Sequence, residues 1–138
     1  LGAANHPEQV IHTGTNITEV SLSFDGNMRP HFAWVEEGVA YFNWYNSLTS
    51  DFEIMTLPGA ISPKVALDDK RAIANSYQSV LLAYIRDDVL YGRDQRDRFQ
   101  VEYTIGPVPY PGSYLVKMGL NNKFRFQYTF YKPLELDT

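Results

Sequence analysis

The densest group of side chains able to bind a charged partner lies between residues 86 and 98. This segment carries four arginines and four aspartates: Arg86, Arg93, Arg96 and Arg98, with Asp87, Asp88, Asp94 and Asp97. Guanidinium groups bind phosphates and carboxylates alike, but a nucleic-acid site needs an excess of positive charge. Because the segment is locally neutral, we predict that these arginines pair with carboxylates within the fold or across a subunit contact, and not with nucleic acid.

Aromatic side chains offer a second kind of surface, since their faces stack on sugar rings when polar groups flank them. The candidates are Trp34, Trp44, Tyr41, Tyr45, Tyr84 and Tyr91. Aromatic residues at alternating strand positions belong mostly to the core. Trp44 and Tyr45 are adjacent, however, so they point to opposite faces of a strand and cannot both be core. These two residues join the four arginines as candidate contacts for assembly or for a glycan.

Catalysis by general acids and bases would need paired carboxylates. The adjacent acids are Glu36-Glu37, Asp68-Asp69 and Asp87-Asp88, and all three pairs fall in predicted turns, where acids usually keep the surface soluble and protect sheet edges. The chain has no Gly-x-Ser-x-Gly elbow, phosphate loop or dinucleotide fingerprint. We therefore predict no catalytic residue, no cofactor and no enzymatic activity.

The histidines could in principle bind a metal. His6 and His12 lie six residues apart with Glu8 between them, and no third ligand is evident. We interpret this stretch as a solvated tail and His31, beside Pro30, as a turn residue. The chain has no cysteine, and we predict no metal site.

The elements that must position these groups are strands, because apolar and polar residues alternate with a period of two in short runs bounded by Gly, Asn, Asp and Pro. We predict one all-β domain over residues 1–138. Its strands are Ile17–Phe24, His31–Val35, Val39–Trp44, Phe52–Leu57, Val80–Ile85, Val89–Arg93, Phe99–Ile105, Tyr114–Leu120 and Phe124–Tyr131. The prolines that we place between or beyond these strands are Pro58, Pro63, Pro107, Pro109, Pro111 and Pro133.

The clearest prediction is the terminal hairpin, residues 113–132. In its second strand Phe124, Phe126, Tyr128 and Phe130 share one face, which we assign to the core.

An internal repeat organises the predicted strands. Residues 34–41 align with residues 84–91, so that Ala33 matches Ala83 and Tyr41 matches Tyr91. The alignment extends to three further pairs: Phe24-Asp25 with Leu67-Asp68, Phe52–Ile54 with Phe99–Val101, and Pro58-Gly59 with the Gly106-Pro107 region. Each unit holds four short antiparallel strands, the content of one β-propeller blade. The sequence therefore predicts two blade-like units, residues 20–59 and 64–107, followed by the hairpin.

The first unit, from Ser23 to Trp34, resembles loosely the strand, Asp-Gly turn and strand that open sialidase-type blades, although Gly26 follows Asp25 directly where the Asp-box has a residue between. The second unit, Leu82–Tyr91 with Arg93 and Gln95–Phe99, is similar to blade sequences in virion proteins of tailed bacteriophages, including tail and DNA-stabilisation components. The resemblance covers residues 66–105 well and 20–57 loosely. It implies a virion location and no enzymatic activity.

Charge and hydropathy limit the partners. The chain carries a net charge of −4, against a nucleic-acid-binding role, and its longest apolar run, Val80–Ile85, is far too short for membrane insertion. No basic-then-apolar leader precedes residue 20, so the sequence is not visibly secreted. Residues 1–63 carry −6 and residues 64–138 carry +2, a division that suits a head-to-tail contact.

We therefore expect a structural virion protein of the phage tail or tail tip that binds other virion proteins. We also expect it to form a homo-oligomer, with a trimer favoured because three two-unit chains supply six blades. The alternative is a carbohydrate-binding propeller lectin, or a host-receptor-binding module that recognises a host-surface glycan.

Overall fold

The computed structural model describes residues 8–68, 79–123 and 125–134, and within these ranges the chain is almost entirely β-structure. The strands are β1 (Ile17–Phe24), β2 (Pro30–Glu36), β3 (Val39–Asn46), β4 (Asp51–Leu57), β5 (Ile61–Asp68), β6 (Ser79–Arg86), β7 (Val89–Asp94), β8 (Tyr103–Pro107), β9 (Tyr114–Leu120) and β10 (Phe126–Tyr131), and one turn of 3-10 helix covers Gln95–Asp97. None of the described residues forms a helix long and apolar enough to cross a membrane.

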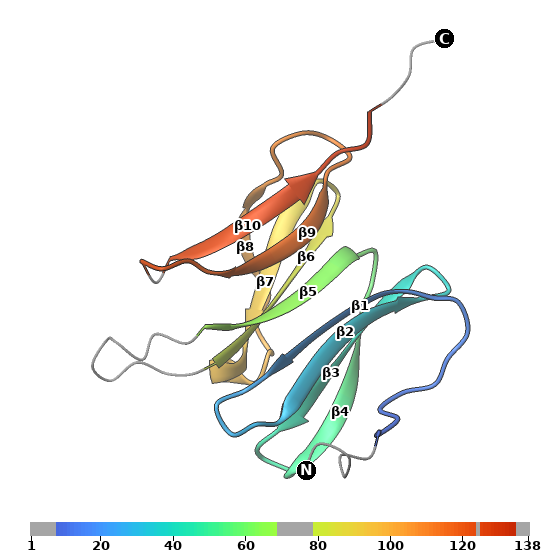
Figure 1. The fold of residues 1–138 in the computed structure, drawn as a ribbon, viewed down its shortest axis with the longest axis vertical. Helices are drawn as coiled ribbons and strands as arrows, with labels where there is room; N and C mark the ends of the chain where they lie inside the picture. The colour runs from blue at the N-terminus through green and yellow to red at the C-terminus, as the bar shows by residue number, and fades with distance from the viewer. Residues whose placement is uncertain (1–7, 69–78, 124, 135–138) are drawn as a thin grey trace, which may run out of the picture.

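The strands form three antiparallel sheets that follow one another along the chain. The first sheet has the order β1-β2-β3-β4, the second has the order β5-β6-β7-β8, and β9 and β10 form the terminal hairpin (Figure 1). Each strand pairs with its neighbour in sequence, so each four-stranded sheet is a simple meander. The predicted all-β class and the two antiparallel four-stranded units are confirmed.

The central hairpins of the two sheets have the same register. Trp34 pairs with Tyr41 in the first sheet, and Tyr84 pairs with Tyr91 in the second, at an offset of 50 residues. The two-residue turns also match, because both turn residues have positive φ in each hairpin, as a type I′ turn requires. The predicted equivalence of Ala33 with Ala83 and of Tyr41 with Tyr91 is confirmed.

The first strands match as well. Phe24 pairs with Pro30, and Leu67 pairs with Val80, which keeps the same offset of 50 residues on the second strand. The residue that follows is an aspartate in both units, and both Asp25 and Asp68 are buried. The aligned pair Phe24-Asp25 and Leu67-Asp68 is therefore confirmed.

The terminal hairpin repeats the first half of this unit, which the sequence analysis did not foresee. In the β1–β2 turn, the Asp25 carboxylate accepts hydrogen bonds from the backbone N–H groups two and four residues later (2.8 and 2.9 Å), and its own N–H donates to the carbonyl of the latter (2.9 Å). In the β9–β10 turn, Asn121 makes the same three bonds at 2.8, 3.1 and 2.9 Å. An Asp or Asn four residues before an Arg is the sequence signal that both turns share.

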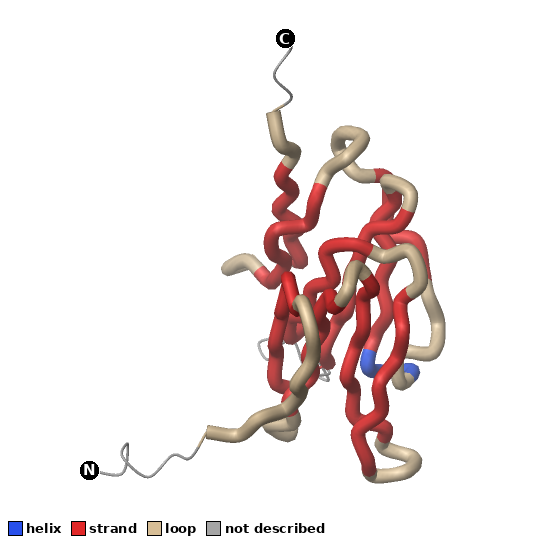
Figure 2. Tube along the Cα trace, turned by 90° about the vertical axis from the view of Figure 1, so that its right-hand side faces the viewer, coloured by secondary structure: helices blue, strands red, loops and turns tan. Residues whose placement is uncertain are grey.

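The three units stack with their first strands side by side. β5 contacts β1 on one side and β9 on the other, and it runs between them across the middle of the molecule (Figure 1). The view turned by 90° shows that strands and loops make up almost all of the described chain, with one short helical turn (Figure 2). One core lies between the first and second sheets, and a smaller core lies between the second sheet and the hairpin.

Each first strand carries an irregularity near the end where its unit begins. The register shifts between Ile17 and Glu19 in β1, between Ile61 and Lys64 in β5, and at Val116 in β9, which has no partner on β10. These β-bulges bend the first strands and increase their twist.

β5 is the one strand that the sequence analysis missed, and Pro63 is the reason. We placed Pro63 between strands, but it lies inside β5 at the bulge, next to Ser62 with its positive φ of 54°. A bulge releases one residue from the ladder, so a proline is tolerated there. Pro107 is likewise the last residue of β8.

The predicted match of Phe52–Ile54 with Phe99–Val101 is wrong. Phe52 lies in β4 and is partly exposed, whereas Phe99 lies before β8 in a left-handed conformation (φ 59°) and is fully buried in the main core. The strand predicted over Phe99–Ile105 therefore begins only at Tyr103.

The terminal hairpin faces as predicted where the structure describes it. Tyr128 and Phe130 pack against the smaller core, which contains Ala83, Ile85 and Leu90 of the second sheet. Phe124, which we assigned to the same face, lies outside the described residues.

The β2–β3 turn gives a test of the shared backbone geometry. Gly38 has φ +76° with no atom near the position of a Cβ, so Gly38→Ala adds only backbone strain, and we expect it to lower the free energy of unfolding by about 1 kcal/mol. Gly119 also has open space around it but no positive φ, and Gly119→Ala is the matched control. Urea unfolding of the two variants checks this, and an equal loss in both would contradict it.

Candidate functional site

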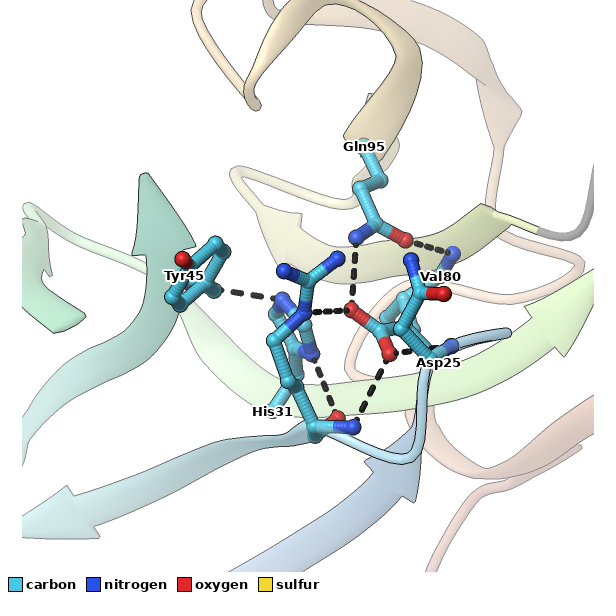
Figure 3. Close-up of polar contacts among 7 residues, drawn as sticks. Asp25, His31, Tyr45, Val80 and Gln95 are labelled. Carbon is cyan, nitrogen blue, oxygen red and sulfur yellow. Dashed lines mark hydrogen bonds and ion pairs between the residues drawn. The ribbon is translucent and has the colours of Figure 1, made fainter. Parts of the chain in front are cut away.

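The most complete polar cluster of the described chain centres on Asp25, between the first and second sheets (Figure 3). Besides its two backbone hydrogen bonds, the carboxylate accepts one from Arg29 Nε (3.1 Å) and one from Gln95 Nε2 (3.0 Å). Burial alone raises the pKa of Asp25, but the hydrogen bonds from Arg29, Gln95 and Asn27 outweigh it and lower the pKa below its usual value. The carboxylate is therefore charged and fully occupied at neutral pH.

Gln95 joins the two units through one side-chain amide. Its Nε2 donates to Asp25, and its Oε1 accepts from the backbone N–H of Val80 at 2.9 Å (Figure 3). Val80 lies in β6, whereas Asp25 follows β1. The 3-10 turn that begins at Gln95 thus fixes the second sheet to the opening turn of the first.

His31 is the second buried polar residue of this cluster, and its interpretation as a turn residue is wrong. It lies inside β2 with no exposed surface, its Nδ1 lies 3.1 Å from the carbonyl of Arg29, and its Nε2 accepts from the backbone N–H of Tyr45 at 3.2 Å. Because a carbonyl can only accept, Nδ1 carries the proton and the ring is neutral. Burial lowers the pKa of His31, which agrees with this state.

This cluster offers little chemistry toward a substrate. A carboxylate has about four acceptor positions, and all of those of Asp25 are used inside the fold. Both nitrogens of His31 are also used. The arrangement is an interlock between two units. Sequence analysis missed it because Gln95 lies 70 residues from Asp25 and no local pattern connects them.

Trp44 and Tyr45 have different surroundings. Trp44 is buried against Phe99, with ring centroids 6.1 Å apart, so it has no face for a ligand. Tyr45 points to the other face, as predicted for adjacent residues, and the guanidinium carbon of Arg29 lies 4.0 Å from its ring centroid. Phe52 meets the same ring edge-on at 5.3 Å.

Arg86 forms an ion pair with Glu102, which lies outside the segment of alternating Arg and Asp. Its guanidinium carbon also lies 4.5 Å from the ring centroid of Tyr91. The hydrogen bond to Glu102 raises the pKa of Arg86, so the guanidinium group stays protonated. Arg86 therefore ties β6 to the segment before β8.

Arg93 contacts no carboxylate directly among the described residues. Its Nε donates to the Tyr84 hydroxyl (3.0 Å), and Nη1 donates to the carbonyl of Phe99 (2.7 Å). Tyr84 in turn donates to Glu102, and burial together with this bond raises its pKa to about 12. Arg93 thus holds the left-handed loop at Phe99 in the core.

Arg96 and Arg98 lie at the other end of the segment. Arg96 Nη2 lies 4.0 Å from the carboxylate of Asp68, and its backbone N–H donates to Asp94 (2.7 Å). Arg98 ends the 3-10 turn in a left-handed conformation and pairs with no carboxylate in the described part of the chain. The structure therefore brings Arg86 and Arg93 together around Tyr84, and it leaves Arg96 and Arg98 apart from them.

The outer face of the first sheet is the last candidate surface. We give this name to the side turned away from the second sheet, formed by Val20, Leu22, Phe24, Phe32 and Trp34. The segment before β1 crosses part of it, and a groove of about 310 Å³ lies between them.

His12 anchors this segment, so its interpretation as part of a solvated tail is wrong. Its ring packs on Trp34 with centroids 4.5 Å apart, and its Nε2 donates to Glu36 at 2.8 Å. The bonds from His12, from the Thr15 N–H and from Trp34 lower the pKa of Glu36. His6 lies outside the described residues, and no three metal-binding side chains gather among those described.

No family model matches the chain, and neither does a curated protein or a solved structure.

The contribution of the Asp25–Gln95 hydrogen bond to stability can be tested by placing a negative charge at position 95. Gln95→Glu replaces the donor with a second carboxylate beside Asp25, and we expect a loss of about 2–3 kcal/mol of stability at neutral pH. The loss should shrink in acid, where the new side chain is protonated and can donate again. The control is Gln100→Glu, an exposed position where the change should stay within about 0.5 kcal/mol. Equal effects in urea unfolding would contradict the interlock.

His31 gives a pH test. Since burial lowers its pKa, the unfolded chain binds the proton more readily, and stability present above a pH of about 6.5 is lost as the pH falls. We expect the free energy of unfolding to fall between about pH 7 and pH 5, and His31→Gln to flatten that slope. The other histidines remain in both proteins, so the difference reports on His31 alone. An unchanged slope would contradict the buried neutral ring.

Proposed function

We propose that this chain is a structural protein of a tailed-bacteriophage virion, and that it acts in the tail or tail tip through stacked propeller-like blades that bind other proteins. The observation that supports this most strongly is the repeated stacking of three units with adjacent first strands. The exposed surfaces of such a stack are sheet faces. These faces are suited to binding other proteins.

The units stack in the same direction, so that the same face of each unit meets the next unit along the chain. The side of the first sheet that carries Ala33 packs on the side of the second sheet that carries Tyr84. The opposite side of the second sheet carries Ala83, the equivalent of Ala33, and it packs on the hairpin. The same face thus meets the next unit twice, as it does between successive blades of a propeller.

The virion setting rests on the sequence resemblance of the second unit. The residues that carry the resemblance include Arg93, Gln95 and Phe99, and all three have structural roles in the stack. Such structural roles fit a protein that acts by binding other proteins in an assembly.

The glycan-binding alternative has less support from the contacts. Trp44 is buried, Trp34 is covered by His12, and one face of Tyr45 is taken by Arg29. The aromatic faces that a sugar would need are largely used inside the fold.

The test is the composition of the virus particle. Particles of the virus that encodes this sequence, purified by density gradient and washed in high salt, should contain the chain by mass spectrometry in a fixed ratio to the capsid protein. Its absence from intact particles would overturn the proposal. Specific binding of the purified chain to a glycan array, at a site lost in Tyr45→Ala, would favour the alternative.

A further inference from the structure

The outer face of the first sheet is the equivalent of a buried interface. Leu22, Phe32 and Trp34 correspond in register to Val65, Leu82 and Tyr84. Those three residues of the second sheet are buried against the first sheet. In the first sheet the same positions point away from the second sheet. Phe32 and Trp34 are only 6% and 3% exposed, whereas Leu22 and its neighbours on β1, Val20 and Phe24, are 48%, 67% and 44% exposed.

The hairpin offers the complementary surface. Its free face, turned away from the second sheet, is formed by Tyr114, Lys117, Gln127, Thr129 and Tyr131, all exposed. In register, Thr129 corresponds to Ala83, which lies on the face that meets the next unit. Each chain therefore presents one surface of each kind, on its first and its last unit. At the inner edge, beside β5, Val20 and Lys117 of the same chain line one hollow.

Charge agrees with this pairing. Residues 114–132 contain four cations and no acid, namely Lys117, Lys123, Arg125 and Lys132. Residues 17–57 contain one cation, Arg29, and the six acids Glu19, Asp25, Glu36, Glu37, Asp51 and Glu53. Summed over whole segments, the hairpin thus carries +4 and the first sheet −5, and such opposite charges attract two copies over a distance. Asp25 is buried and Glu36 is bonded to His12 of the same chain, so the attraction acts between segments and not through ion pairs within the two faces.

We propose that the outer face of the first sheet binds the free face of the hairpin of a second copy of this chain, head to tail. In this contact the last unit of one copy meets the first unit of the next copy through the same pair of faces that meet twice inside the chain. It leaves one surface of each kind free on a dimer, so it extends to further copies until a ring closes. The inference rests on the proposed assembly function and names its partner.

The N-terminal segment occupies part of the same surface. His12 covers Trp34, whereas Val20 and Leu22 at the β1 edge stay accessible beside it. The second copy therefore contacts β1 first, next to the groove that the segment forms with this face.

The test measures self-association of the purified chain by sedimentation velocity at micromolar concentration. Leu22→Asp places a charge in the apolar face, outside the hollow that Val20 and Lys117 share, and Lys117→Glu reverses a charge on the hairpin; each should weaken association by about tenfold or more. Leu48→Asp, at a 73% exposed position in the β3–β4 turn, is the control and should leave association unchanged. Association should also weaken as salt is raised.

Mixing distinguishes this contact from others. Leu22→Asp retains an intact hairpin, and Lys117→Glu retains an intact first sheet, so a mixture of the two variants should form a two-chain species that neither forms alone. That species would also show that both variants are folded. A wild-type monomer at all concentrations, or a mixture that stays monomeric, would overturn the proposal. A monomer that is still found in purified particles would leave the assembly function standing and refute only self-association.

Discussion

A buried carboxylate is the constraint on which the stack depends. Asp25 loses its hydration between two sheets, and this is tolerable only because two backbone N–H groups, Arg29 and Gln95 occupy its oxygens. Gln95 can reach it only if the second sheet stands at one distance and angle. The relative position of the two units is therefore set by a polar contact as well as by the apolar core.

The core explains why the chain needs a second unit at all. A four-stranded meander has two faces, and β2 is buried on both of them: Ala33 faces the second sheet, while Trp34 lies under His12. The second sheet is also buried on both faces, because the first sheet covers one face and the hairpin covers the other. Only the first sheet keeps an apolar side that no complete unit covers.

The sequence alone predicted the features that depend on residues close together in the chain, namely strands and turns. The strands Ile17–Phe24 and Tyr114–Leu120 were placed correctly because their alternation is regular, and the offset of 50 residues followed from matching turns. β5 was missed because a bulge with Pro63 breaks the alternation. The interlock could not be predicted, since Gln95 finds Asp25 only after both sheets have formed. The third half-unit did have a signal, the spacing of Asn121 and Arg125, which is the spacing of Asp25 and Arg29.

The bulges in the three first strands affect how the chain avoids aggregation. β1, β5 and β9 are all sheet edges, and a straight edge strand is a template on which another chain can add by backbone pairing. A bulge near the same end of each of them bends and twists the ladder groups out of line. The Val65 N–H on the β5 edge is moreover taken by the Ser21 hydroxyl at 3.0 Å. The three edges can thus lie together at the middle of the molecule without fusing into one sheet or recruiting a foreign strand.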